Sequence, residues 1–378
     1  MRFETKAIHF AQEPDESTGA VIRPVYQTST YRQESIGKNK GFEYSRTGNP
    51  TRRSLEELIA SLEEAKYGSA FSSGVAATTA VLNLLRPGDH VVAGDDIYGG
   101  TFRLLEKIYK PWGIDVTYAD VDDTGSFEKA LMKNTRLIWI ETPTNPLLKV
   151  IDISDIARIA KKGGALLAVD NTFASPYFQR PIAHGADLIV HSTTKYLSGH
   201  SDIIGGAVIT DDEKINSSIR FYQNAAGAVP GPWDCWLVER GIKTLALRMR
   251  QHEENALFLA QYLKDHPKIY KIYYPGLMQS KYHDIARKQM DGFGGMISIE
   301  LKGGLSSVKR LVSRLKIFML AESLGGIESL VCYPSKMTHA AFSSKQRRLK
   351  GISDSLVRLS VGIEDKEDLL KDLEHALG

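Results

Sequence analysis

Short apolar runs alternate with a helical pattern between about residue 68 and residue 240 of the chain. The runs that are typical of buried strands are HVVAGD (90–95), RLIWIE (136–141), LLAVDN (166–171) and DLIVHS (187–192). Between the second and third runs, the segment DISDIARIAKKGG places apolar residues on one helical face: Ile153, Ile156, Ala157 and Ala160. Strand–helix–strand repeats of this length predict a mainly parallel sheet that is covered by helices.

The first 47 residues follow a different pattern. They are rich in Thr, Ser, Pro, Gln and Gly and show little periodicity. However, the segment FEYSRTGNPTR carries aromatic and arginine residues that a disordered tail does not need, so we expect an arm that docks on another surface. After the arm, Asn49 is the expected N-cap of a helix, and Pro50 lies in its first turn.

The pattern changes again after about residue 240. The segment RGIKTLALRMRQHEENALFLAQYLKDH (240–266) predicts one long amphipathic helix, and DKEDLLKDLEHAL (365–377) predicts a closing helix. Two strands are expected between them, MISIEL (296–301) and SLVRLSVG (355–362). The expected division is an arm (1–47), a large α/β domain (48–239) and a smaller α+β domain (240–378).

Composition and charge narrow the class of protein. Hydrophobic residues make up 42% of the 378 residues, and the net charge of +3 gives no reason to expect a nucleic-acid partner. Cys235 and Cys332 lack the spacing of a disulfide framework or a metal site, and the chain has no H-E-x-x-H zinc motif. No apolar stretch approaches the roughly 20 residues that cross a bilayer, and MRFETKAIHF lacks the core of a signal peptide. We therefore expect a soluble cytoplasmic protein without a membrane or metal partner.

Polar side chains follow the predicted strands, where ligands bind in parallel sheets. These residues are Tyr98, Asn145, Asp170, Ser192, Thr194 and Lys195. A ring, an amide, a carboxylate, two hydroxyls and an amine on one rim suit pyridoxal 5'-phosphate. The aldehyde of this cofactor reacts with a lysine amine, here Lys195, and its ring nitrogen needs an acid partner, here Asp170.

A candidate phosphate site lies in the segment FSSGVAATTAVLNLL. Gly74 precedes an alanine-rich helix, with Ser72 and Ser73 as possible caps. Backbone N–H groups at a helix start bind anions, and the helix dipole strengthens this binding. Together with the hydroxyls of Ser192 and Thr194, this helix start is expected to hold the phosphate.

A family resemblance extends this interpretation over nearly the whole chain. The motifs that carry it are YSRTGNPTR, SSGVAAT, DDIYGGT, ETPTNP, HSTTKYLSGHSD, GAVPGPWDC, RGIKTLALRM, AESLGGIESL and LVRLSVGIED. In this order they resemble the Cys/Met-metabolism enzymes that use pyridoxal phosphate. The resemblance implies the aspartate-aminotransferase-like fold (fold type I) that these enzymes share.

The resemblance implies a role for each residue of the cofactor site. Lys195 binds the aldehyde, Asp170 pairs with the ring nitrogen, and Tyr98 stacks on the ring. The residues assigned to the phosphate are Gly74, Val75, Ser192 and Thr194, with Tyr44 and Arg46 reaching the phosphate of a neighbouring subunit. A site shared between chains requires at least a dimer, and the family commonly forms homotetramers as dimers of dimers.

The resemblance also implies how a small amino-acid substrate binds. Arg358 takes the α-carboxylate through its two-pronged guanidinium, and Asn145 and Ser323 help to place the substrate and the lysine. The distal amino-acid end of L-cystathionine is assigned to Arg46, Arg103 and Glu322. Catalysis is assigned to Lys195 as the general base at Cα, to Tyr98 as a proton donor to the leaving sulfur, and to Asp170 through the cofactor ring.

The reaction that the resemblance implies is γ-elimination on L-cystathionine, which gives cysteine, 2-oxobutyrate and ammonia. Glu322 is the residue type that γ-acting members carry in AESLGGIESL, so β-elimination is the weaker hypothesis. The first alternative is γ-replacement, in which cysteine displaces the acyl group of an O-acylhomoserine. The second is γ-elimination from methionine, although enzymes of that type usually have Cys where this chain has Gly100.

Other classes of protein fit the sequence less well. A nicotinamide dehydrogenase would carry G-x-G-x-x-G after its first strand, and this chain does not. A binding or regulatory protein that has lost its chemistry would not need Lys195, Asp170 and Tyr98 together.

Overall fold

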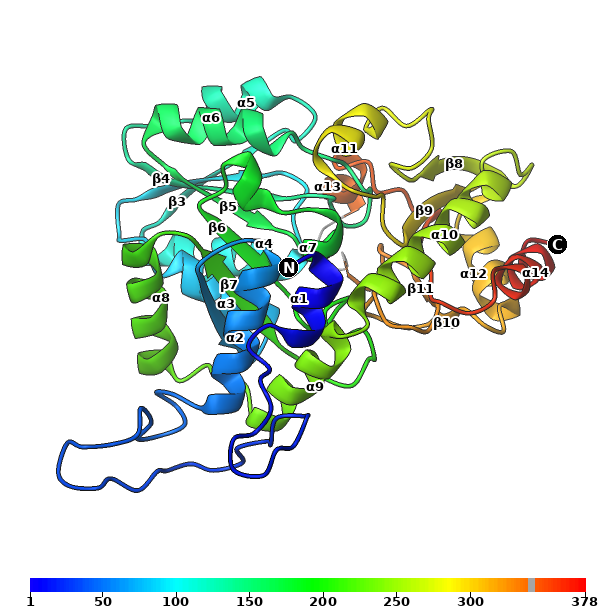
Figure 1. Ribbon diagram of the computed structural model, residues 1–378. Helices are drawn as coiled ribbons and strands as arrows, with labels where there is room; N and C mark the ends of the chain where they lie inside the picture. The colour runs from blue at the N-terminus through cyan, green and yellow to red at the C-terminus, as the bar shows by residue number, and fades with distance from the viewer. Residues whose placement is uncertain (339–343) are drawn as a thin grey trace.

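The computed structural model describes residues 1–338 and 344–378, which form two β-sheets with helices on their faces (Figure 1). The first sheet has the strand order β1-β7-β6-β5-β4-β2-β3. Its strands are β1 (Tyr67–Phe71), β2 (His90–Gly94), β3 (Asp115–Ala119), β4 (Thr135–Glu141), β5 (Leu166–Asp170), β6 (Leu188–His191) and β7 (Gly206–Thr210). β7 runs antiparallel to β1 and β6, and the other neighbouring pairs are parallel.

The second sheet has the order β10-β11-β12-β9-β8 and is antiparallel except for the pair β10–β11. Its strands are β8 (Ile269–Tyr273), β9 (Met296–Leu301), β10 (Met319–Leu320), β11 (Leu330–Cys332) and β12 (Leu356–Ser360). The helices up to α7 are α1 (Phe3–His9), α2 (Pro50–Leu62), α3 (Gly74–Leu82), α4 (Gly99–Leu104), α5 (Thr124–Lys129), α6 (Ile153–Gly163) and α7 (Ser175–Phe178). The later helices are α8 (Glu213–Ala226), α9 (Pro232–Ile242), α10 (Leu245–Leu263), α11 (His283–Gln289), α12 (Gly304–Arg314), α13 (Ser344–Leu349) and α14 (Lys366–Leu377).

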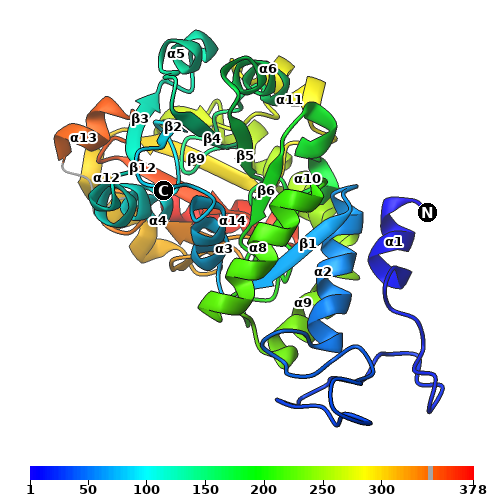
Figure 2. The same cartoon turned by 90° about the vertical axis from the view of Figure 1, so that its left-hand side faces the viewer.

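All four predicted strands of the first sheet are confirmed as β2, β4, β5 and β6. Successive side chains of a strand point to opposite faces, and both faces of this sheet are buried. Val91 and Trp139 lie in the core that includes residues of α3 and α4, whereas Val92 and Ile138 lie in the core that includes Ile156 of α6. Figure 2 shows α3 and α8 on one side of this sheet and α5 and α6 on the other. The predicted parallel sheet with helix-covered faces is therefore confirmed.

The start of the chain is more structured than its sequence predicts. Residues 3–9 form α1, which packs on α2 and α10 and buries Ala7. Beyond α1, the segment up to residue 49 contains only isolated bridges and leaves the body of the protein as an extended loop (Figures 1 and 2). Asn49 is the N-cap of α2, as predicted, because its side chain accepts the N–H groups of Thr51 and Arg52. The arm that the sequence predicts stays a proposal with respect to any neighbouring subunit.

The prediction of one long helix over residues 240–266 is wrong. Instead, α9 ends at Ile242 and α10 begins at Leu245. The Gly241 carbonyl accepts the Thr244 N–H at 3.2 Å and the Arg248 Nη2–H at 2.8 Å, so it is turned away from a continuous helical ladder. The predicted strands β9 and β12 and the closing helix α14 are confirmed. The division at residues 47 and 239 stays a proposal, and α9 spans the second of these points.

In residues 1–338 and 344–378, no helix is both long enough and apolar enough to span a membrane.

We expect Gly241→Ala to lower the free energy of unfolding by about 3 kcal/mol, because overpacking against a backbone atom cannot relax easily. A Cβ at this position would lie 2.2 Å from the carbonyl oxygen of Ser198, in the loop after Lys195. Urea unfolding measures the effect. The control is Gly231→Ala at the start of α9, where the nearest atom, Asp234 Oδ2, would lie 3.6 Å away. That variant should cost about 1 kcal/mol or less. Equal losses in the two variants would contradict the packing explanation.

Candidate active site

A cavity of about 280 Å³ lies between the carboxyl edge of the first sheet and β12 of the second. Most of the residues singled out in the sequence line it. These are Gly74, Val75, Tyr98, Asn145, Asp170, Ser192, Thr194, Lys195, Glu322, Ser323 and Arg358. Three of the predicted residues, Tyr44, Arg46 and Arg103, lie outside it.

The register of the parallel strands explains why residues far apart in the sequence meet here. Glu141 at the end of β4 pairs with Asp170 at the end of β5, and Asp170 pairs with Val190 of β6. Ser192 and Lys195 follow β6 directly. Because these strands run in the same direction, their last residues and the loops after them share one edge.

Lys195 faces the cavity with an amine that is easily deprotonated. Its Nζ donates to the Oγ of Ser323 at 2.7 Å. Burial and, second, the positive charge of Arg358 lower the pKa of Lys195 to about 8, while Glu322 opposes the shift. Half of the amine is therefore uncharged near pH 8, which is the form that attacks a carbonyl.

Asp170 lines the same cavity as this amine, in a setting that favours a cationic partner. Burial raises the pKa of Asp170, and hydrogen bonds from Thr172 oppose this effect. The Thr172 N–H donates to Asp170 Oδ1 at 3.1 Å. A carboxylate that burial makes costly to ionise is stabilised by a protonated ring nitrogen placed against it.

The start of α3 forms a cradle against the loop after β6. A Cβ added at Gly74 would lie 2.9 Å from the Cβ of Ser192, so only glycine allows this close approach. Ser73 caps the helix by accepting the Ala76 N–H at 3.0 Å. The first N–H groups of a helix have no partner within the helix, so they are available to an anion. Thr194 is partly occupied, because its hydroxyl donates to the Gly205 carbonyl at 3.2 Å and accepts the Gly205 N–H at 3.0 Å.

Tyr98 places an aromatic ring on the cavity wall at the start of α4. Its side chain is 39% exposed, which leaves a face of the ring accessible. A Cβ at Gly100 would lie 2.4 Å from the ring carbon Cε1. The ring therefore has this position only because residue 100 is glycine.

Arg358 brings a buried positive charge from β12 to the cavity. Its Nη1 donates to Asn145 Oδ1 at 2.8 Å, and its Nη2 donates to the Ser323 carbonyl at 2.7 Å. The residue is 1% exposed, and its Nε is buried without a hydrogen-bond partner in the described part of the chain. A guanidinium with a spare donor beside a cavity suits a carboxylate ligand.

Glu141 is a cavity residue that the sequence did not single out, because it appears there as the last residue of an apolar run. It is 4% exposed and lines the cavity next to Asp170. Burial and the charge of Asp170 raise the pKa of Glu141, and the N–H groups of Tyr98 and Asn145 oppose this shift. A polar residue at the end of a buried strand in ETPTNP was the only signal that could have identified it.

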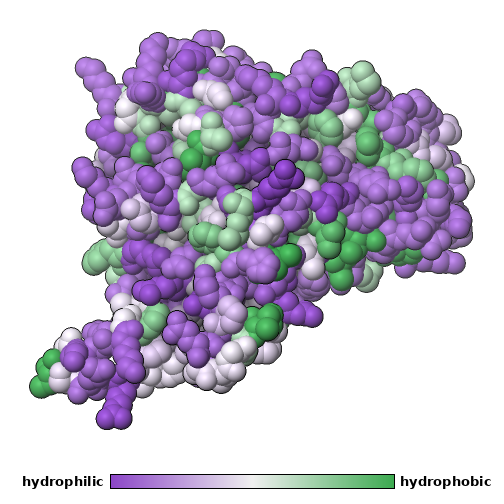
Figure 3. Space-filling view, in the orientation of Figure 1, coloured by the Kyte–Doolittle hydropathy of each residue, from purple (hydrophilic) through white to green (hydrophobic). Residues whose placement is uncertain are grey.

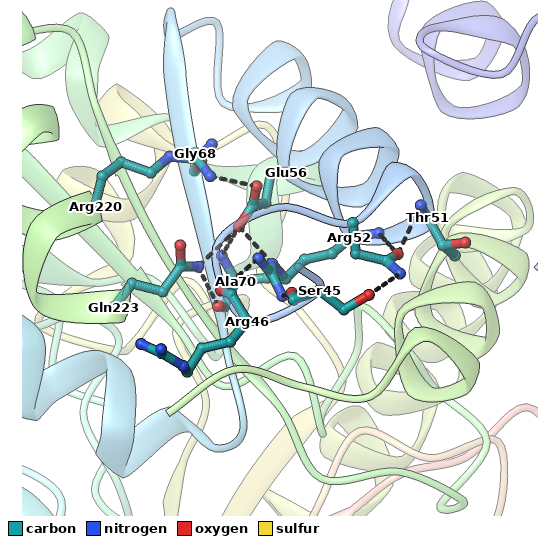
Figure 4. Close-up of polar contacts among 10 residues, drawn as sticks. Ser45, Arg46, Thr51, Arg52, Glu56, Gly68, Ala70, Arg220 and Gln223 are labelled. Atoms are coloured by element: carbon teal, nitrogen blue, oxygen red, sulfur yellow. Dashed lines mark hydrogen bonds and ion pairs between the residues drawn. The ribbon is translucent and has the colours of Figure 1, made fainter. Parts of the chain in front are cut away.

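The predicted residues outside the cavity lie at the base of the arm and on α4. Figure 4 shows that Arg52 fixes the arm there, donating to the Ser45 carbonyl at 2.7 Å and the Arg46 carbonyl at 3.0 Å. The Arg46 guanidinium itself donates to the Asn224 carbonyl at 2.6 Å, and the side chain of Tyr44 is 47% exposed. Arg103 is exposed on α4. None of these three side chains contributes to this chain's own cavity.

The donor set fits pyridoxal phosphate. The start of α3 and Ser192 would hold the phosphate in the cradle that a side chain at position 74 would fill. Asp170 would face the ring nitrogen, Lys195 would reach the aldehyde, and Tyr98 would cover the ring.

The relatives of this chain share that cofactor chemistry. The family model described as Cys/Met metabolism PLP-dependent enzyme matches residues 4–378. A cystathionine beta-lyase of Lactococcus lactis subsp. cremoris is 53% identical over 374 residues, covering 99% of this chain and 98% of the relative. A cystathionine gamma-synthase of Mycobacterium tuberculosis is 52% identical over 376 residues, covering 99% of this chain and 96% of the relative.

A solved structure agrees with this assignment. The crystal structure of cystathionine gamma-lyase from Lactobacillus plantarum complexed with L-serine has a TM-score of 0.96 and 48% sequence identity to this chain. The match covers 100% of this chain and 98% of the chain in that structure. The expected fold class is therefore confirmed. The chain belongs to the Cys/Met metabolism PLP-dependent enzymes, has their fold type I architecture and takes pyridoxal phosphate as its cofactor.

Proposed function

We propose that this chain catalyses γ-elimination on L-cystathionine. One molecule of L-cystathionine and one of water then give L-cysteine, 2-oxobutyrate and ammonia. The relatives named above act on cystathionine or form it, which supports the substrate class.

The observation that carries the proposal is the buried guanidinium of Arg358. It lies at the cavity with an unpartnered Nε–H, and its two other nitrogens are held by Asn145 and Ser323. Such a fixed cation binds the α-carboxylate of an amino acid in a single orientation. Since Ser323 also accepts from Lys195 Nζ, the bound carboxylate would set Cα close to that amine.

The residues of this chain have distinct tasks in the proposed reaction. When bound, pyridoxal phosphate withdraws electrons from the amino acid attached to it and so acidifies the protons near its Cα. The Lys195 amine, which is mostly uncharged above about pH 8, takes the Cα proton of the substrate. It then returns this proton further along the substrate side chain. The Tyr98 hydroxyl, on a residue that lines the cavity, is the proposed donor of a proton to the sulfur that leaves from Cγ. Asp170 keeps the ring nitrogen charged.

We propose that the distal end of the substrate lies near Glu322, at the rim of the cavity. Glu322 is exposed and lines the cavity beside Ser323, so its carboxylate is available to the distal ammonium group. Arg46 and Arg103 are proposed for the distal carboxylate, with Arg46 coming from the arm of a second copy. This assignment follows the resemblance described for the sequence.

The arm supports a partner of the same chain. It carries apolar side chains that this chain leaves uncovered, with Val21 77% and Ile22 51% exposed. The surface view shows the arm protruding from the body with apolar atoms at its tip (Figure 3). Exposed apolar surface of this kind is typical of an interaction site. We therefore propose a homotetramer, built as a dimer of dimers, in which Tyr44 and Arg46 reach a neighbouring cofactor.

Cystathionine γ-synthase is the second candidate function. The 52% identity to the Mycobacterium tuberculosis synthase over nearly the whole chain favours it. Methionine γ-lyase is a weaker third candidate, because enzymes of that type usually have Cys where this chain has Gly100. The present position of the Tyr98 ring leaves no room for a Cβ there.

Product analysis distinguishes these functions. We expect the holoenzyme to form 2-oxobutyrate and cysteine from L-cystathionine faster than it forms cystathionine from an O-acylhomoserine and cysteine. The two reactions are measured at equal enzyme concentration by quantifying each product. Pyruvate and homocysteine as the main products would instead show β-elimination, and a faster second reaction would show the synthase.

We expect Arg358→Ala to raise KM for L-cystathionine by about 10- to 100-fold, because hydrogen bonds to charged groups contribute about 1.5–3 kcal/mol. Steady-state kinetics measure the change. The control is Arg136→Ala, at the end of β4 that lies away from the cavity, where the side chain is 52% exposed. That variant should keep its KM, and an unchanged KM in Arg358→Ala would reject the carboxylate role.

The lowered pKa of Lys195 predicts how fast the cofactor is bound covalently. The uncharged amine predominates above about pH 8, so the rate of covalent attachment to apoprotein should rise through this pH and then level off. Borohydride trapping and mass spectrometry of the Lys195 peptide measure the rate. For an ordinary lysine side chain, used as a free model amine, the rate of attachment should instead rise through about pH 10.4. Lys195→Ala should show no attachment, and a rise only near pH 10 in the protein would contradict the prediction.

A further inference from the structure

Glu141 holds two loops of the site with one carboxylate. Its Oε2 accepts the Tyr98 N–H at 2.7 Å, and its Oε1 accepts the Asn145 N–H at 3.1 Å. Both oxygens are therefore engaged by backbone N–H groups. Each oxygen thus already holds one backbone donor in place, and the side chain lines the cavity.

The two N–H groups belong to loops that leave neighbouring strands. Tyr98 lies after β2 and begins α4, while Asn145 lies after β4, which pairs with β2. Glu141 is itself the last residue of β4, where it pairs with Asp170. The carboxylate thus fixes both loops relative to the sheet that carries the acid partner of the cofactor.

The contacts continue from Asn145 to the lysine. Asn145 Oδ1 accepts from Arg358 Nη1 at 2.8 Å, and Arg358 Nη2 donates to the Ser323 carbonyl at 2.7 Å. Lys195 Nζ donates to Ser323 Oγ at 2.7 Å. Glu141 therefore joins the backbone of the stacking residue to a hydrogen-bonded series that ends at the reactive amine.

We propose that Glu141 is a positioning residue of this active site. Its carboxylate fixes the backbone of Tyr98 and that of Asn145 to the same side chain. The Tyr98 ring and the Arg358 guanidinium, which Asn145 holds, therefore keep a fixed position relative to each other. The role of Glu141 in cofactor binding rests only on the family to which the chain belongs. Its role in substrate binding rests on the proposed function.

Glu141→Gln tests the proposal with almost no change in size. A glutamine has one acceptor oxygen, and its NH₂ group cannot accept, so one of the two backbone N–H groups loses its partner. We expect the dissociation constant of pyridoxal phosphate to rise about tenfold (about 1.4 kcal/mol), because the loop that loses its partner is no longer held in the geometry that binds the cofactor. Equilibrium dialysis of apoprotein against pyridoxal phosphate measures this constant without any turnover.

Asp96→Asn is the matched control. Asp96 is a buried carboxylate in the loop after β2, which also carries Tyr98. Its Oδ2 accepts the Thr144 hydroxyl at 2.7 Å. The side-chain oxygen of asparagine can keep that bond. The substitution replaces a carboxylate by an amide, as Glu141→Gln does. Cofactor affinity in this variant should stay within about twofold of the original protein. An equal loss in both variants would show that charge, not positioning, is responsible, and would overturn the proposal.

Glu141→Ala and the stability of the apoproteins complete the test. Alanine removes both acceptors, so its loss of cofactor affinity should exceed that of Glu141→Gln, and Glu141→Asp should lose less than either. A lower urea midpoint with unchanged cofactor affinity would reduce Glu141 to a purely structural residue and overturn the proposal. If Glu141→Gln does not fold, the order of affinities between Glu141→Asp and the original protein decides.

A kinetic measurement separates this proposal from the proposed function. In Glu141→Ala, which removes both acceptors, KM should rise about tenfold for whichever cystathionine reaction the original enzyme performs, because Asn145, which holds Arg358, is no longer fixed. If the original enzyme does not turn over L-cystathionine, the proposed function fails, but the cofactor affinities still decide the role of Glu141. An unchanged cofactor affinity in all three Glu141 variants would overturn the proposal even if the function holds.

Discussion

The buried guanidinium of Arg358 links the two sheets around the cavity. A charge in the protein interior is costly unless hydrogen bonds replace its water. The partners of Arg358 come from two places, Asn145 after β4 of the first sheet and the Ser323 carbonyl between β10 and β11 of the second. The two sheets cannot separate around the cavity without removing these partners. The need to satisfy one cation therefore holds the two halves of the site together.

Asn145 lets that cation coexist with a buried anion. Its backbone N–H donates to Glu141, and its side-chain oxygen accepts from Arg358, so one residue supplies a donor to the carboxylate and an acceptor to the guanidinium. Each of the two groups thus gains a hydrogen-bond partner without water, while Arg358 Nε stays without one in the described part of the chain. The same low-polarity surroundings lower the pKa of Lys195 and raise that of Asp170. The reactivity of the site follows from this burial.

The sequence predicts those parts of the protein that depend on periodicity. The strands β2, β4, β5 and β6 follow from apolar runs, and parallel strands bring the residues after them to one edge, which is why Asp170 and Lys195 were found together. Tertiary contacts decide the rest. At the break between α9 and α10, the Gly241 carbonyl accepts from Thr244 and Arg248, and helical periodicity carries no sign of these contacts. Glu141 was missed because its function lies in two backbone contacts that no pattern of side chains reveals.

The position of each group explains how one scaffold serves related enzymes that make or cleave cystathionine. In the proposed function the buried residues contact the cofactor and the α-carboxylate of the substrate, and every amino acid attached to the cofactor presents its α-carboxylate in the same way. In the proposed reaction the bond that breaks lies further out, towards the rim, where Glu322 is exposed. Substitutions at the rim can change the choice of bond without disturbing the paired charges beneath. Relatives that share 52% and 53% of aligned residues with this chain can therefore bear the names of different reactions.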